Sequence, residues 1–167
     1  MISFQKYLME ARIDAPNGIF VKMSPTTESI VALKARIPEM TAEDPHITLI
    51  YAKEPAFNVK LPVVSKDARF RVEGFEIERF AGENDVGYIV LRARSMELHN
   101  LHDSFREAGL TPTFPEYKPH VSLIHPAPTG KFDAFMDEQN HLLADRPLEL
   151  TFFYGGYVIL DEEPPKA

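Results

Sequence analysis

The sequence predicts an α+β protein in which antiparallel sheet carries helices on its outside. Three observations lead to this class. A strand, a helix and a second strand follow one another twice along the chain, and each second strand carries the same His-x-Thr/Ser phrase. A long alternating segment separates the two sets, and an apolar, aromatic segment follows the second. An internal duplication is the simplest account of this order.

The first set begins with a predicted strand at residues 18–23. A helix is expected over residues 24–37, because Ser, Pro and Thr are typical of helix starts and apolar residues then recur at helical spacing. A short acidic connection, residues 39–44, leads into a strand at 46–51 that holds the first phrase.

The segment between the two sets, residues 68–80, alternates apolar and polar side chains and predicts a long strand. Gly74 interrupts this pattern and marks a possible bulge. A turn containing Gly, Asn and Asp follows, so we expect this strand to pair with the one at 86–92.

The second set continues with a helix over residues 96–108, which Gly109 ends. A loop rich in proline and aromatic residues, 111–118, leads into the strand at 120–125 that holds the second phrase. Residues 147–160 predict a strand pair or one bent strand, with two glycines near the middle.

The chain has 167 residues, of which 44% are apolar, and this predicts one compact domain. We expect the domain over residues 18–160, an N-terminal arm or docking helix over 1–17, and a flexible tail at 161–167. No segment approaches the roughly 20 apolar residues that span a bilayer, so no membrane partner is expected.

Composition excludes several classes of function. The chain has no cysteine, which rules out disulfides, thiolate metal sites and a thiol nucleophile, and agrees with a reducing cytoplasm. A formal charge of −7 disfavours a protein that holds long duplex nucleic acid by its backbone. A small phosphorylated ligand needs only a local pocket of donors and stays compatible with this charge.

The two phrases read Pro-His-Ile-Thr-Leu-Ile and Pro-His-Val-Ser-Leu-Ile, and their histidines are His46 and His120. Side chains alternate along a strand. His46 and Thr48 are therefore expected on one face, while Tyr51 and the apolar residues between them face the other. The same alternation pairs His120 with Ser122. Each phrase predicts one acid/base group and one hydroxyl on a polar face.

These residue types suit the cleavage of a phosphodiester. The reaction needs a base, an acid and donors for the charge on the phosphoryl oxygens. His46 and His120 can divide the first two tasks, because imidazole titrates near neutral pH. Thr48 and Ser122 can donate hydrogen bonds to the non-bridging oxygens. Neither a metal ion nor another cofactor is expected.

The histidines also allow other interpretations. A single histidine on a strand is most often structural, but repetition of the same polar pair favours a shared chemical role. A metal site with Asp44 or Glu43 as helper is less favoured, because only two histidines converge and hydroxyls are poor zinc ligands. His99 and His102, three residues apart on a helix, are typical of a polar helix face.

The doubled phrase resembles the signature of the 2H phosphoesterase superfamily, and the resemblance extends over about residues 18–160. It implies two pseudo-symmetric lobes of antiparallel sheet around a central groove, with outer helices. It also implies metal-independent chemistry on 2′,3′-cyclic phosphates, or on 3′-5′ linkages attacked by a neighbouring 2′-hydroxyl. One of His46 and His120 would be the base and the other the acid.

A narrower likeness is to phage-encoded 2H nucleases that degrade the cyclic di- and oligonucleotide signals of bacterial CBASS immunity. The similar features are the first strand, the Glu-Tyr-Lys-Pro run before His120, and acidic and aromatic residues near the C-terminus. By position, the resemblance implies substrate contacts from Phe20, Glu149 and Tyr154. Tyr117, in the loop before His120, is a further candidate that either stacks on a base or covers an edge.

The expected function is hydrolysis of the 3′-5′ bonds of a cyclic di- or oligonucleotide immune signal by a metal-independent phosphodiesterase. The first alternative is an RNA 2′,3′-cyclic phosphodiesterase that acts on RNA ends, and the second is a protein that binds a cyclic nucleotide without cleaving it. The expected location is the cytoplasm, that of the host if a phage encodes the chain. The sequence leaves the true substrate, the acid and base assignments and the oligomeric state open.

Overall fold

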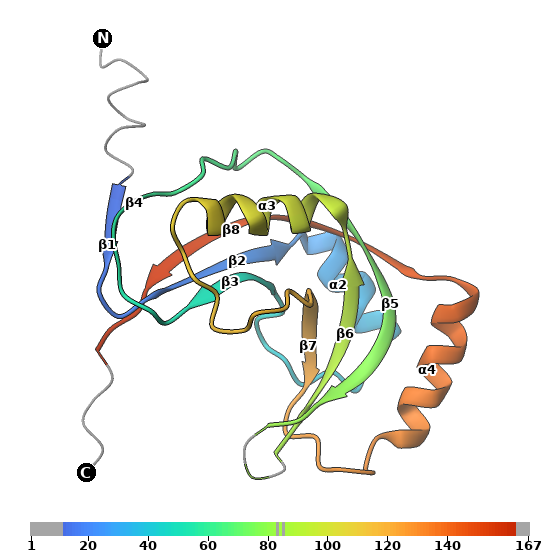
Figure 1. The fold of residues 1–167 in the computed structure, drawn as a ribbon. Helices are drawn as coiled ribbons and strands as arrows, with labels where there is room; N and C mark the ends of the chain where they lie inside the picture. Colours follow the sequence, from blue (N-terminus) through green and yellow to red (C-terminus); the bar gives the residue numbers. More distant parts are fainter. Residues whose placement is uncertain (1–11, 83, 85, 163–167) are drawn as a thin grey trace.

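The computed structural model describes residues 12–82, 84 and 86–162, and its ribbon is drawn in Figure 1. The predicted docking helix falls mostly on residues 1–11, outside the described residues. Within the described part, strands and helices follow in this order: β1 Arg12–Ala15, β2 Ile19–Pro25, α2 Thr27–Arg36, β3 Ile47–Ala52, β4 Ala56–Lys60, β5 Phe70–Phe80, β6 Tyr88–Arg94, α3 Met96–Glu107, β7 His120–Ile124, α4 Asp133–Asp145 and β8 Leu148–Ile159.

Six of the strands form one closed antiparallel ring in the order β2-β3-β7-β6-β5-β8. β8 changes partner along its length: residues 148–152 pair with β5, and residues 152–159 pair with β2. On the opposite side of the ring, β3 and β7 are joined by a single residue pair. The α+β class with antiparallel sheet is therefore confirmed, and the arrangement as two pseudo-symmetric lobes stays a prediction.

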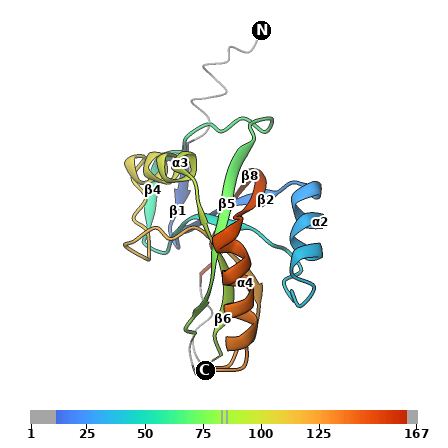
Figure 2. The same cartoon turned by 90° about the vertical axis from the view of Figure 1, so that its right-hand side faces the viewer.

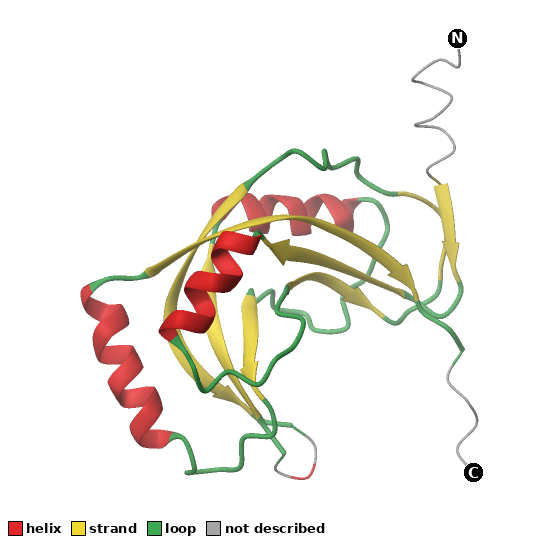
Figure 3. Cartoon of the chain, turned by 180° about the vertical axis from the view of Figure 1, so that it is seen from behind, coloured by secondary structure: helices red, strands yellow, loops and turns green. Residues whose placement is uncertain are grey.

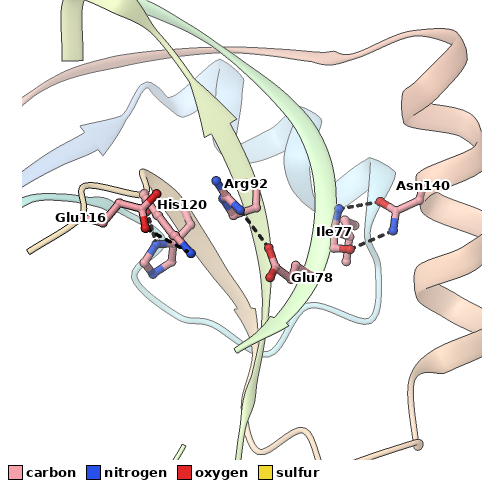
Figure 4. Close-up of polar contacts among 7 residues, drawn as sticks. Ile77, Glu78, Arg92, Glu116, His120 and Asn140 are labelled. Carbon is pink, nitrogen blue, oxygen red and sulfur yellow. Dashed lines mark hydrogen bonds and ion pairs between the residues drawn. The ribbon is translucent and has the colours of Figure 1, made fainter. Parts of the chain in front are cut away.

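The helices lie outside the ring, as expected. α4 packs on β5, α3 on β3, and α2 on β2 and β8. The side view in Figure 2 places α2 and α3 on opposite sides of the strands, and the rear view in Figure 3 shows α2 and α4 in front. Asn140 of α4 binds the backbone of Ile77, which lies beyond the part of β5 that pairs with β8. Its Oδ1 accepts the Ile77 N–H at 2.6 Å, and its Nδ2 donates to the Ile77 carbonyl at 2.8 Å (Figure 4).

The apolar core follows the alternation of the strands. On β2, the odd-numbered residues from Ile19 to Met23 are fully buried, whereas Phe20 and Lys22 between them are half-buried. Strand residues from β3, β6, β7 and β8 complete this core together with Leu98 and Phe105 of α3. Alternation therefore divides each central strand into a core face and a second face that stays available to a site.

Most predicted elements are present within a few residues of their expected ends. The long strand predicted at 68–80 is β5, which begins at Phe70 and whose register shifts next to Gly74. Gly109, with φ of 111°, follows the end of α3. The last segment is one strand, β8. The start of α2 differs from the prediction, because Pro25 ends β2 and the Thr26 hydroxyl caps the helix.

Three elements were not predicted: β1, β4 and α4. β1 lies within the predicted arm and pairs with β4 in a separate two-stranded sheet. α4 begins without a side-chain cap and buries only Gln139 and Leu143, so its sequence carries little of the helical pattern. No helix in the described residues is long and apolar enough to cross a membrane.

Candidate active site

The two His-x-Thr/Ser phrases lie side by side at neighbouring strands, with His46 immediately before β3 and His120 as the first residue of β7. β3 and β7 are antiparallel and pair through the central residue of each phrase. Extending this register by one residue in each direction sets His46 opposite Ser122 and Thr48 opposite His120. Opposite residues in such a pair have Cα atoms about 4.5–5.5 Å apart, and diagonal ones about 7–8 Å. The four polar side chains therefore form one group.

Both histidines are held by the same backbone contact. Nδ1 of His46 lies 2.9 Å from the carbonyl oxygen of Asp44, and Nδ1 of His120 lies 2.8 Å from that of Lys118. A carbonyl oxygen can only accept a hydrogen bond, so Nδ1 carries the proton in each ring. Nε2 is then the atom of each imidazole that can take up or release a proton for a substrate.

Each imidazole also has one phenylalanine against it. Phe20 of β2 meets the His46 ring at a centroid distance of 5.6 Å and an angle of 81°. Phe80, at the end of β5, meets the His120 ring at 4.7 Å and 66°. Phe20 therefore lies on the face of the first phrase, and its contact with a substrate stays a prediction. Phe80 was not among the predicted site residues, since its contact depends on how β5 and β7 are arranged in the ring.

Charged residues surround His120. Arg92 of β6 pairs with His120 across the strands, and its Nη1 lies 3.0 Å from Glu78 Oε2 of β5 (Figure 4). Burial lowers the pKa of His120, and the charges of Arg92 and His46 lower it further, against opposing effects of the Lys118 carbonyl and Glu78.

Arg92 retains unused hydrogen-bonding capacity. Its side chain is 22% exposed and lies over the ring of Phe75 at 5.6 Å. Its Nε is buried and has no hydrogen-bond partner among the residues that the structure describes. The guanidinium as a whole is a partly exposed cation next to His120 and suits an anionic ligand. In the sequence, Arg92 is one of two arginines at the end of an apolar strand, and this pattern does not point to a site.

The ion pair next to the first phrase is more open. Lys22 Nζ of β2 lies 3.1 Å from Asp44 Oδ2, and the Asp44 side chain is 74% exposed. Solvent screens such a pair strongly, so it contributes little to stability. The same Asp44 provides the carbonyl that holds His46.

A cavity of about 610 Å³ opens next to the paired phrases. Its size falls in the range of small-molecule sites, and most of its wall is apolar or aromatic. Its lining does not include four described residues that were predicted for the site: His46, Phe20, Glu149 and Tyr154. The lining includes Thr48, Tyr51, Phe80, Phe114, Tyr117, His120 and Ser122.

The orientation of Tyr51 corrects the alternation predicted for β3. Along the pairing with β2, Val21 faces Ile50 but Lys22 faces Thr48, so Leu49 is an extra residue in a β-bulge. A bulge reverses the alternation beyond it. Tyr51 therefore meets the Phe20 ring at 6.3 Å, on the face of His46, instead of pointing into the core.

A stacked pair of rings holds the backbone of β3 beyond its junction with β7. The Tyr117 hydroxyl donates to the Thr48 carbonyl at 3.0 Å, and His102 Nδ1 donates to the Leu49 carbonyl at 2.7 Å. The two rings stack at 4.0 Å and 1°. His102 is only 5% exposed, so its assignment to a polar helix face was wrong. Burial lowers its pKa and raises that of Tyr117.

Glu149 and Tyr154 lie on β8, away from the cavity. Glu149 is exposed and lies opposite Glu73 in the backbone pairing of β8 with β5. Tyr154 stacks on Phe105 of α3 at 6.4 Å, and burial, with a smaller effect of Tyr157, raises its pKa to about 12. The pairing of β8 with β2 has a bulge at Gly155 and Gly156, after Tyr154. Their predicted contacts with a substrate stay untested.

The geometry suits acid–base chemistry on an anionic ligand. Among the described residues, no three His, Asp or Glu side chains lie together so that they could hold a metal ion.

The family model of the anti-CBASS protein Acb1 matches residues 18–148, which is more than half of the chain. Both phrases, Phe20, Tyr117 and the Arg92–Glu78 pair lie within the matched residues, and Glu149 and Tyr154 lie after them. A comparison with curated proteins finds no match. On the strength of the family match, the chain belongs to the anti-CBASS protein Acb1 family.

Proposed function

We propose that this protein is a 2H-type phosphodiesterase that cleaves 3′-5′ bonds of a cyclic di- or oligonucleotide signal and so counteracts CBASS immunity. Family membership supports the role against CBASS. One observation carries the chemistry: the same backbone contact holds the imidazoles of His46 and His120, next to the residue pair Ile47–Val121 that joins β3 and β7.

The surroundings of His120 support its role as the base. A lowered pKa favours neutral imidazole at neutral pH, and neutral Nε2 accepts a proton. In the proposed reaction, His120 takes the proton of the attacking 2′-hydroxyl or water as the new O–P bond forms. His46 gives a proton to the 5′ oxygen as its bond to phosphorus breaks.

The charge on the phosphoryl oxygens needs donors that are already in place. The hydroxyls of Thr48 and Ser122 share the face of the imidazoles and suit this task. Arg92 adds a positive charge next to His120. These local donors explain how a chain with a formal charge of −7 can hold an anionic ligand.

The direct test is cleavage. The full chain is incubated in EDTA with 3′,3′-cyclic GMP-AMP and, separately, with a nucleoside 2′,3′-cyclic phosphate, and products are separated by chromatography. We expect cleavage of the cyclic dinucleotide. Cleavage of the mononucleotide alone would indicate RNA-end processing, and tight binding without cleavage would indicate a sequestering protein.

Alanine variants test the two histidines. His46→Ala and His120→Ala are each expected to abolish turnover and leave the circular dichroism spectrum unchanged, because both side chains are only half-buried. His141→Ala is the matched control, since His141 is exposed on α4. Near-normal rates in either site variant would contradict the acid and base assignment.

A further inference from the structure

A row of aromatic rings leads from the first phrase to the rim of the cavity. Phe20 contacts His46 on one side and Tyr51 on the other. Tyr51 in turn stacks with Phe114 at a centroid distance of 6.5 Å and an angle of 26°. Both Tyr51 and Phe114 line the cavity that contains His120. The row therefore connects the paired histidines with a surface beyond them.

Phe114 is exposed although it lies in a well-anchored loop. Its side chain is 67% exposed. The residue before it, Thr113, donates its backbone N–H to the Tyr51 carbonyl at 2.8 Å and accepts the N–H of Lys53 on its hydroxyl at 3.0 Å. Three residues later, the Tyr117 hydroxyl donates to Thr48. The loop is fixed to β3 on both sides of Phe114 by polar contacts.

This arrangement differs from a phenylalanine that merely covers apolar surface. Burial of the ring would stabilise such a residue, whereas here backbone hydrogen bonds hold the loop and leave the ring in water. A positive charge is also close, since Lys53 Nζ lies 5.7 Å from the centre of the Tyr51 ring. Exposed aromatic rings beside a cation are the pattern of sites that stack nucleobases and hold phosphates.

We propose that Tyr51 and Phe114 form a base-stacking shelf that holds a second nucleobase of the cyclic oligonucleotide whose scissile phosphate lies at His46 and His120. The proposal rests on the proposed function for the identity of its ligand. Phe20 lies nearer the histidines and would take the first base, so the shelf sets a preference for ligands with at least two bases. The base stacks on the exposed face of Phe114, and Tyr51 supports that ring from behind.

Binding of a fluorescent analogue tests the shelf. The probe is the bis-phosphorothioate of 3′,3′-cyclic di-AMP with one adenine replaced by 2-aminopurine, whose emission is quenched when it stacks. The chain has no tryptophan, so its own emission does not interfere. Phe114→Ala is expected to weaken binding by about 5- to 150-fold, the range for loss of one stacked base, and to reduce the quenching.

The matched control is Phe57→Ala. Phe57 is 65% exposed, like Phe114, but lies on β4 and outside the cavity lining. The Phe57→Ala variant is expected to bind the probe with the same affinity and the same quenching as the unmodified protein. Equal affinities for Phe114→Ala and the unmodified protein would overturn the shelf, as would equal losses in the two variants.

Cleavage assays separate this proposal from the function on which it rests. In an active protein, Phe114→Ala should lower kcat/KM for 3′,3′-cyclic GMP-AMP and leave kcat/KM for 2′,3′-cyclic AMP, which has one base, unchanged. Equal losses on both ligands would overturn the shelf and leave the function standing. An inactive protein whose binding still depends on Phe114 would keep the shelf and overturn the proposed cleavage.

Discussion

In the His120 half of the site, Arg92 and Glu78 form a partly buried ion pair beside the imidazole, whereas the carboxylate of the ion pair in the His46 half, that of Asp44, is mostly exposed. The two halves otherwise match: each Nδ1 donates to the carbonyl two residues earlier, and each ring meets a phenylalanine. Duplicated phrases therefore produce duplicated backbone geometry. The neighbouring strands give the two imidazoles different electrostatic surroundings, and in the proposed reaction this difference assigns the base to His120 and the acid to His46.

Asparagine at either histidine should have the largest effect. The amide of His46→Asn or His120→Asn can still donate to the backbone carbonyl, but it exchanges no proton near neutral pH. Each variant should lower kcat for the cyclic dinucleotide by about 10²- to 10⁴-fold.

The pH–rate profiles of these two variants distinguish the halves. The residual activity of His120→Asn should no longer increase with pH on the acid side of the profile, because that increase reports deprotonation of the base. Residual activity without His46 should lose the fall at high pH. The reverse pattern would exchange the two roles.

The hydroxyls should come next in size. Thr48→Ala or Ser122→Ala removes one donor to the phosphoryl oxygens and should lower kcat by up to about 10²- to 10³-fold. Thr48→Ser and Ser122→Thr keep the hydroxyl and serve as controls in the same assay. Loss of activity in the hydroxyl-preserving exchanges as well would point to packing instead of donation.

The ion pair of the His120 half should act on the pKa of that histidine, in opposite directions for its two members. Arg92 lowers the pKa, so Arg92→Met should raise it and move the rise of activity to higher pH. Glu78 raises the pKa, so Glu78→Gln should lower it and move the rise to lower pH. Titration of the His120 ring by NMR measures both shifts, and shifts of equal sign would show that the pair does not act through its charges.

The smallest effect should come from the stacked rings of His102 and Tyr117, which hold the backbone of β3. No such ring pair holds β7 among the described residues. Tyr117→Phe removes only the hydroxyl that donates to the Thr48 carbonyl. The free energy of unfolding in urea should fall by about 0.5–1.5 kcal/mol, the usual contribution of one hydrogen bond. Tyr88→Phe, which changes an exposed tyrosine on β6, is the control. A change of equal size in both variants would argue against a specific role for the Thr48 contact.

Local pattern predicted the elements that have strong signals. Strand alternation placed His46 with Thr48 and His120 with Ser122, and Gly74 and Gly109 marked a register shift and a helix end that the structure contains. α4 lacked such a signal, because it has no capping side chain and a narrow buried stripe.

The sequence by itself determined the pairs of residues that share a strand face, because alternation is a property of one extended segment and needs no partner. The tertiary structure decided which strands became neighbours, and so placed Arg92 and Phe80 against His120. It also placed the bulge at Leu49 that turns Tyr51 toward the site, since a bulge is defined only by the register of two strands. Electrostatic surroundings and stacking surfaces depend on contacts between distant segments, and no local pattern contains them.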